Sequence, residues 1–137
     1  MSKHLDTINL KLSKCENKPT NLIAFPHGAI INLTTNIDPP TPTISYWFDF
    51  LSNKDAKAEL IKLKQKSLDV IVIISIQELA WKTHEDLFRP DDKYLTQREI
   101  NKYLLKIVNT DNYLNIYNFY QDKTKIEVFT IKKLMCN

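Results

Sequence analysis

Glycine is nearly absent from this chain of 137 residues, which contains only Gly28. Phosphate-binding loops, dinucleotide fingerprints and nucleophile elbows each need more than one glycine, because only a residue without Cβ adopts positive φ freely or lets a ligand approach the backbone. The sequence therefore excludes the protein classes that these motifs define. No second histidine lies near His84 to make the paired-histidine pattern of a metal site.

Cysteine is also scarce, and Cys15 and Cys136 lie near opposite ends of the chain. The ends of a compact domain often lie close together, so a disulfide between them is geometrically possible. Nothing else in the sequence is typical of a disulfide scaffold, and we expect both thiols to be reduced.

Long hydrophobic runs are missing as well. The longest, Val70–Ile74, is far shorter than the roughly 18 residues that a membrane span needs. Residues Met1–Ser13 lack the continuous apolar segment of a signal peptide. As written, the sequence predicts a cytoplasmic protein, and a signal removed from the natural chain would change this expectation.

The composition is otherwise that of an ordinary globular protein, with 43% hydrophobic and 26% charged residues. Its length predicts a single domain over residues 1–137. The net charge of +3 is mild and the basic residues are dispersed, so charge alone is weak evidence for a nucleic-acid partner.

Apolar periodicity predicts the sheet. Alternation or a continuous apolar run indicates strands at Ile8–Ser13, Ala29–Thr35, Thr43–Phe50 and Leu68–Ile76, and a C-terminal hairpin of Tyr113–Tyr120 and Lys125–Leu134. In Thr43–Phe50 the alternation puts Ile44, Tyr46, Phe48 and Phe50 on one side. Leu68–Ile76 is apolar on both faces and is predicted to be central.

Helical spacing and capping residues predict two or three helices, at about Lys54–Lys66, Gln77–Phe88 and Gln97–Val108. Ser52 is a suitable N-cap for the first, and Thr96 with Glu99 form a capping box for the last. A strand, a helix and a strand in succession would pair Thr43–Phe50 with Leu68–Ile76 in parallel. The predicted fold is thus a single α+β domain with a mixed sheet and covering helices.

No catalytic constellation emerges, so we expect a non-catalytic protein–protein interaction or assembly subunit without cofactor or metal. Pro39, Pro40 and Pro42 make Asn36–Thr43 a rigid exposed loop, and tyrosine is common at protein interfaces. The predicted partner-binding residues are Asp38, Pro39, Pro40, Thr41, Pro42, Tyr117 and Tyr120.

Two other functions stay open. A nucleic-acid-binding module could use the lysine-rich helix Lys54–Lys66, or a winged-helix arrangement of the Thr96–Val108 helix and the C-terminal hairpin. An enzyme could assemble a site from scattered residues such as His84, Glu85 and Arg89. Glu78 and Lys82, four residues apart, predict a helical ion pair rather than a nuclease site.

Two segments carry a resemblance to a known family. Leu33–Pro40 leads into the aromatic stretch Thr43–Phe50, and Asn112–Tyr120 leads into Lys125–Leu134. This pattern is similar to the small outer-membrane lipoproteins of type VI secretion systems, although Asn115 stands where that family usually has glycine. Leu12-Ser13-Lys14-Cys15 looks like a lipid-attachment box except for Lys14.

The resemblance implies a β-sandwich with a helical insertion, as an alternative to the mixed sheet. It also implies a non-enzymatic, periplasmic role, in which a loop contacts a large inner-membrane partner. By analogy that loop would be Asn36–Thr43 or a later hairpin turn.

Overall fold

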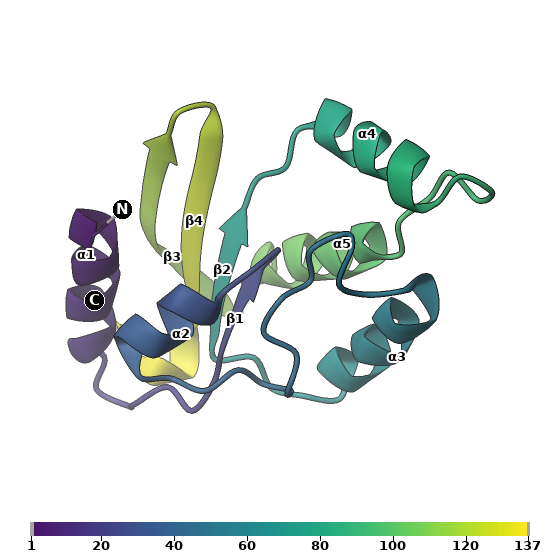
Figure 1. Cartoon of the computed structure of the whole chain (residues 1–137). Helices are drawn as coiled ribbons and strands as arrows, with labels where there is room; N and C mark the ends of the chain where they lie inside the picture. The colour runs from purple at the N-terminus through teal and green to yellow at the C-terminus, as the bar shows by residue number, and fades with distance from the viewer. Residues whose placement is uncertain (1, 137) are drawn as a thin grey trace.

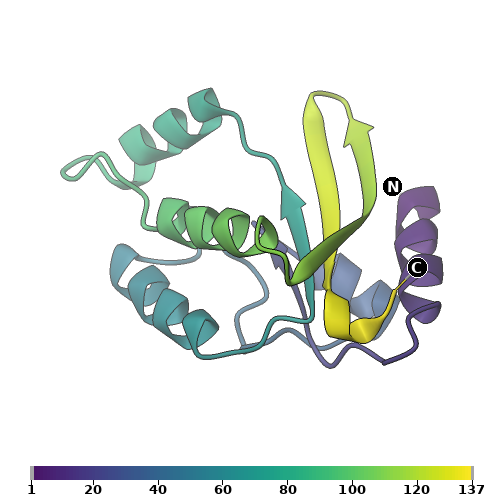
Figure 2. The same cartoon turned by 180° about the vertical axis from the view of Figure 1, so that it is seen from behind.

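Four strands form one mixed sheet at the centre of the molecule, and helices cover both of its faces (Figures 1 and 2). The computed structural model describes residues Ser2–Cys136. Strand order is β1-β2-β4-β3, with β1 parallel to β2 and both other pairs antiparallel. The predicted α+β class is confirmed, whereas the β-sandwich alternative is wrong, because the described strands make one sheet.

The strands are β1 (Leu22–Phe25), β2 (Val70–Ile74), β3 (Tyr113–Gln121) and β4 (Thr124–Ile131). The helices are α1 (Ser2–Ser13), α2 (Ala29–Thr35), α3 (Asn53–Lys64), α4 (Glu78–Phe88) and α5 (Gln97–Val108), with a 3₁₀ turn η1 (Lys132–Leu134). No helix of this described range is long and apolar enough to cross a membrane.

Strand β2 is central, as its sequence predicts. Val70 and Val72 point into a core beneath α1 and α2, while Ile71 and Ile73 point into a second core beneath α3, α4 and α5. All four side chains are buried. The parallel neighbour is β1, however, and not the predicted Thr43–Phe50.

Two N-terminal segments that were predicted as strands, Ile8–Ser13 and Ala29–Thr35, are helical. Leu5, Ile8 and Leu12 lie one turn apart and are buried, whereas Leu10, which the strand pattern would also bury, is 57% exposed. The predicted strand Ala29–Thr35 is likewise helix α2, of which only Ile31 is buried. In α1 a helical stripe against the sheet buries three apolar residues, whereas α2 leaves Ile30 and Leu33 exposed.

The aromatic segment Thr43–Phe50 is not a strand, and only an isolated bridge from Ser45 to His27 gives it strand-like pairing. Tyr46 and Phe48 are buried in the core beneath α3, α4 and α5. Ile44 and Phe50 were predicted on the same side, yet they are exposed because the chain turns at both ends of the segment.

The three predicted helices are confirmed as α3, α4 and α5. The Ser52 hydroxyl accepts a hydrogen bond from the Asp55 amide at 3.1 Å and caps α3. The predicted capping box of α5 is wrong, because Thr96 has helical backbone angles and makes no side-chain cap. Glu99 instead contacts Tyr94 and Lys102.

The C-terminal hairpin is confirmed, with Asp122 and Lys123 in its turn and a bulge between Asn115 and Tyr117. Its second strand ends at Ile131, where the predicted strand continued to Leu134.

Cys15 and Cys136 form a disulfide, which corrects the expectation of two reduced thiols. The bond joins the chain just after α1 to the residues after η1, across 121 positions of sequence. The Asn17 amide donates to the Leu134 oxygen at 3.0 Å beside it, so the two ends of the chain are held together.

The single glycine is required by close packing. A Cβ at Gly28 would lie 2.7 Å from the Ala24 Cβ and 3.0 Å from Asn32 Oδ1, and the backbone φ of −129° needs no glycine. We expect Gly28→Ala to lower the free energy of unfolding by about 1–3 kcal/mol, because α2 must move away from β1. Urea denaturation measures this, and an unchanged midpoint would contradict the packing argument.

Candidate functional site

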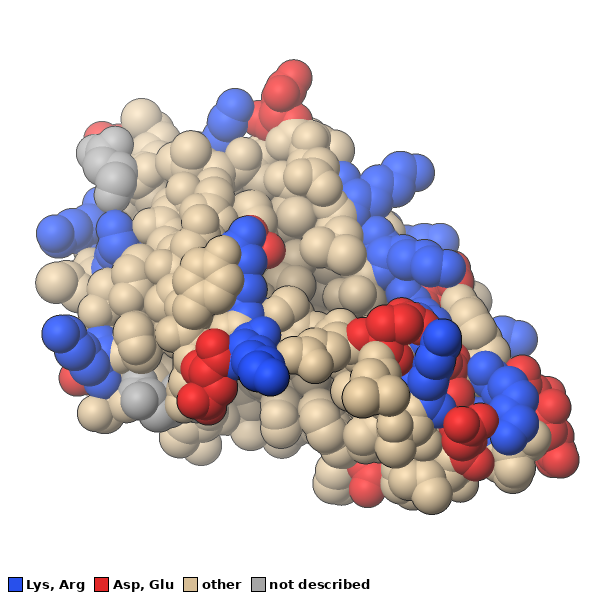
Figure 3. Space-filling view, turned by 90° about the horizontal axis from the view of Figure 1, so that it is seen from above, with Lys and Arg blue, Asp and Glu red and all other residues tan. Residues whose placement is uncertain are grey.

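An apolar groove opens where β1 and β2 end, between α1, α2 and the segment that follows α2. Its volume is about 490 Å³. It is lined by Leu5, Ile8, His27, Ala29, Ile30, Ile31, Ile44, Ser45, Phe50, Ile74, Phe119 and Ile126. In the view from above, much of this upper side of the molecule is uncharged, and many of the charged side chains stand toward its margins (Figure 3).

The groove wall carries no formally charged lysine, arginine, aspartate or glutamate among its lining residues. Three of its apolar side chains are left in water: Ile30 is 55% exposed, Ile44 48% and Phe50 72%. Exposed apolar side chains that gather at a concave surface are typical of a binding site, because covering them releases the unfavourable contact with water.

A second hollow of about 300 Å³ adjoins the groove and shares Ala29 and Ile44 with it. Leu33, Ile37 and Pro39 give it apolar walls. Asp38 is its one charged lining residue. The two hollows can therefore hold two neighbouring apolar groups, with a negative charge at one end.

The loop that forms the second hollow is held by backbone contacts. The Asp38 oxygen accepts from the Leu22 amide at 2.9 Å, and the Asn32 side-chain amide donates to the Ile37 and Leu22 oxygens. These bonds attach the loop to the outer edge of β1, so Asp38 and Pro39 have a fixed position beside the groove.

Thr41 has a different role from its predicted one. It is buried, and its hydroxyl contacts the carboxyl group of Glu59, which also accepts from the Tyr46 hydroxyl at 3.2 Å. Burial, and then the nearby Glu59, raise the pKa of Tyr46 well above its usual value. Thr41 therefore anchors the loop to α3 and presents no side chain to a partner.

The other predicted partner-binding residues do not form one surface. Asp38 and Pro39 line the second hollow, with Pro40 partly buried and Pro42 exposed nearby in sequence. Tyr117 and Tyr120 lie on β3, at the opposite edge of the sheet from β1. The Tyr117 hydroxyl is 3.1 Å from His4 Nδ1 of α1, whereas Tyr120 is 71% exposed.

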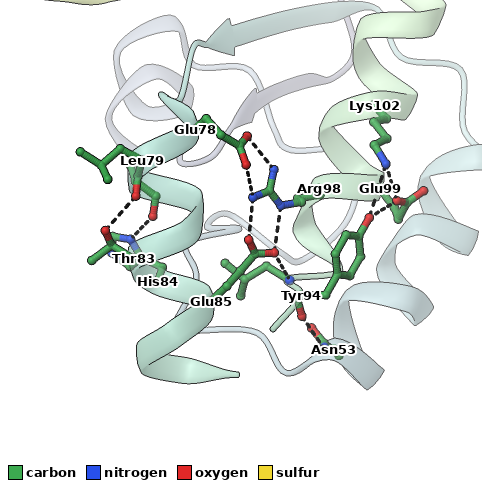
Figure 4. Close-up of polar contacts among 12 residues, drawn as sticks. Asn53, Glu78, Leu79, Thr83, His84, Glu85, Tyr94, Arg98, Glu99 and Lys102 are labelled. Carbon is green, nitrogen blue, oxygen red and sulfur yellow. Dashed lines mark hydrogen bonds and ion pairs between the residues drawn. The ribbon is translucent and has the colours of Figure 1, made fainter. Parts of the chain in front are cut away.

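The densest charged cluster joins α4 to α5 (Figure 4). Arg98 binds Glu78 through two nitrogens, at 3.0 and 2.9 Å, and Glu85 at 2.6 and 2.9 Å. Its guanidinium group holds the pKa of Glu85 below the usual value. The Leu95 amide also donates to Glu85, so this carboxylate is fully engaged in holding the two helices together.

The scattered enzyme site is not assembled. Glu85 pairs with Arg98, whereas Arg89 binds Asn53 and the Leu51 oxygen, and His84 Nδ1 lies 2.7 Å from the Ala80 oxygen. The predicted Glu78–Lys82 ion pair is replaced by Glu78–Arg98. Among residues 2–136, no group of three or more histidine, cysteine, aspartate or glutamate side chains could hold a metal ion.

The groove itself was missed because its walls come from segments whose conformation was predicted wrongly. Ile30 and Ile44 were each assigned to strands, in which the same residues would belong to the core. Their exposure follows from helix α2 and from the irregular chain after it. The one sequence feature that pointed to this region was the proline-containing loop Asn36–Thr43, which lies between Ile30 and Ile44 in the sequence.

The chain matches no protein-family model, no curated protein and no solved structure.

Proposed function

We propose that this protein is a non-catalytic interaction domain that binds an apolar segment of a protein partner in the groove between α1 and α2. The observation that carries this proposal is the pair of adjoining hollows on either side of Ala29 and Ile44. A polypeptide that places two apolar side chains in them would cover Ile30, Ile44 and Phe50 together.

The negative charge of Asp38 at the second hollow indicates that the bound segment carries a basic residue. Asp38 is exposed at the end of an otherwise uncharged surface. A lysine or arginine beside the second apolar side chain would meet this carboxylate, and complementary charge fixes the direction in which a segment lies. The proposed ligand is therefore a peptide with two apolar anchors and a basic residue at one end.

Peptides selected from a random library displayed on phage provide the probe. Selection on the whole oxidised protein should enrich sequences with two apolar residues and one lysine or arginine. Ile44→Asp should weaken their binding by at least about tenfold, because a carboxylate between the two hollows must be desolvated. Fluorescence anisotropy measures this affinity.

Ile61→Asp is the matched control, because Ile61 is 60% exposed on α3 and lines neither hollow. It should leave the affinity unchanged. Asp38→Lys should weaken only peptides that carry the basic residue. Selected peptides that bind Ile44→Asp as tightly as the parent protein would refute the proposed function.

The nucleic-acid alternative remains a prediction with its own signature. Helix α3 retains its exposed lysines, but the C-terminal hairpin lies in the central sheet next to β2 instead of standing free as a wing. Nucleic-acid binding would show steep salt dependence, whereas binding of an apolar peptide would change little with salt.

The disulfide is relevant to the cellular compartment of the protein. Disulfides persist in oxidising compartments and are rare in the cytosol. The Cys15–Cys136 bond therefore supports the periplasmic alternative over the cytoplasmic one. A role in a secretion system remains a prediction from the family resemblance.

A further inference from the structure

His27 is the one side chain lining the apolar groove, among the described residues, that can change its charge near neutral pH. The other lining residues come from α1, α2, the segment after α2, and strands β2, β3 and β4. All of them are apolar except Ser45, and none is charged. Histidine changes its charge between about pH 5 and pH 8. The groove wall therefore carries either no charge or one positive charge, depending on the pH.

The backbone holds His27 in place at the groove wall. The Gly28 amide donates to the Ile44 oxygen at 3.2 Å, and a β-bridge joins His27 to Ser45. The imidazole ring stacks on Trp47, with 5.1 Å between the ring centroids. His27 is nevertheless exposed, so water can solvate a charge on its ring while the groove is empty.

We propose that protonation of His27 regulates peptide binding, so that the groove binds its apolar segment tightly when His27 is neutral and weakly when it is charged. This inference rests on the proposed function, because it concerns the same groove. A bound apolar segment replaces the water around the ring with hydrocarbon. Loss of water costs an imidazolium ion more free energy than a neutral imidazole, and binding therefore favours the neutral form.

Two other histidines lie close to the groove without lining it. His4 of α1 stacks on the ring of Phe119, a lining residue, at 4.0 Å between centroids. His84 of α4 packs edge-on against Trp47 at 5.7 Å, and so contacts the ring on which His27 stacks. A peptide in the groove would cover His27 rather than these two rings, which makes them matched controls.

Fluorescence anisotropy tests the inference with the whole oxidised protein and a library-selected peptide that contains no histidine. The affinity should fall by at least about fivefold between about pH 7.5 and about pH 5.5, a range in which ordinary carboxylates stay charged. His27→Phe keeps an uncharged ring beside Trp47 and should bind equally at both pH values. His4→Gln and His84→Gln should keep the pH dependence of the parent protein.

Nuclear magnetic resonance of the His27 ring gives an independent readout. Peptide binding and protonation are linked reciprocally, so adding the peptide at about pH 6.5 should move the ring resonances toward their neutral positions. Equal affinity at both pH values, or a pH dependence that persists in His27→Phe, would overturn this inference alone. A peptide that binds Ile44→Asp as tightly as the parent at the higher pH would refute the proposed function, and this inference with it.

Discussion

Replacing both Cys15 and Cys136 with serine should lower the free energy of unfolding by about 2–5 kcal/mol. The bond closes a loop that includes almost the whole chain, because the two cysteines are 121 positions apart in sequence. Its removal gives the unfolded chain many more conformations. Chemical denaturation of the oxidised parent and of the double variant measures the difference.

Reductant provides the matched control for this prediction. The reduced parent should denature like the double serine variant, and the variant itself should not respond to reductant. Equal denaturation midpoints for the oxidised and reduced parent protein would contradict a stabilising disulfide.

Arg98→Ala should lower the free energy of unfolding by about 3 kcal/mol. Glu85 is 5% exposed, and Arg98 supplies two of its hydrogen bonds. Without the guanidinium group, a buried carboxylate loses its counter-charge. Glu78→Gln is the control, since the Glu78 side chain is 61% exposed and its pair with Arg98 should contribute far less to stability than the Glu85–Arg98 pair.

The stability lost in Arg98→Ala should depend on pH, because it depends on the charge of Glu85. Hydrogen bonds from Arg98 lower the pKa of Glu85 in the folded protein below its ordinary value of 4.5. The Glu85 contribution is therefore present above that value and is lost as the pH falls through the folded-state pKa. The difference in free energy of unfolding between the parent protein and Arg98→Ala should therefore become smaller in acid. A difference that grows below pH 4.5 would contradict this account.

Much of the central and C-terminal architecture could be predicted from local sequence. Val70–Ile74 is short and continuously apolar, which is typical of a central strand. Helix α5 carries Ile100, Leu104 and Val108 at helical spacing, and all three are buried. In these segments the local pattern and the tertiary environment favour the same structure.

The N-terminal segments could not be predicted in this way. Leu5, Ile8 and Leu12 fit a helix while Ile8, Leu10 and Leu12 fit a strand, and only the position of the sheet decides between them. Strand β1 has four residues, too few for a periodicity. Because the groove is made by α1, α2 and the chain beside β1, errors in these elements concealed it.

The disulfide could not be predicted from the sequence for the same reason. The spacing of Cys15 and Cys136 permits a bond but does not require one. Cys15 lies beside the C-terminal residues because helix α1 packs against the sheet. The pairing thus depends on the element that the sequence pattern predicted as a strand.

The most direct test of the central claim is a titration of the isoleucine methyl groups by nuclear magnetic resonance, with a library-selected peptide as ligand. Ile30, Ile44, Ile74 and Ile126 line the groove, whereas Ile61, Ile100 and Ile107 belong to α3 and α5. The account predicts that the first group shifts on binding and the second does not. Shifts confined to α3 and α5, with the groove methyl groups unchanged, would contradict it.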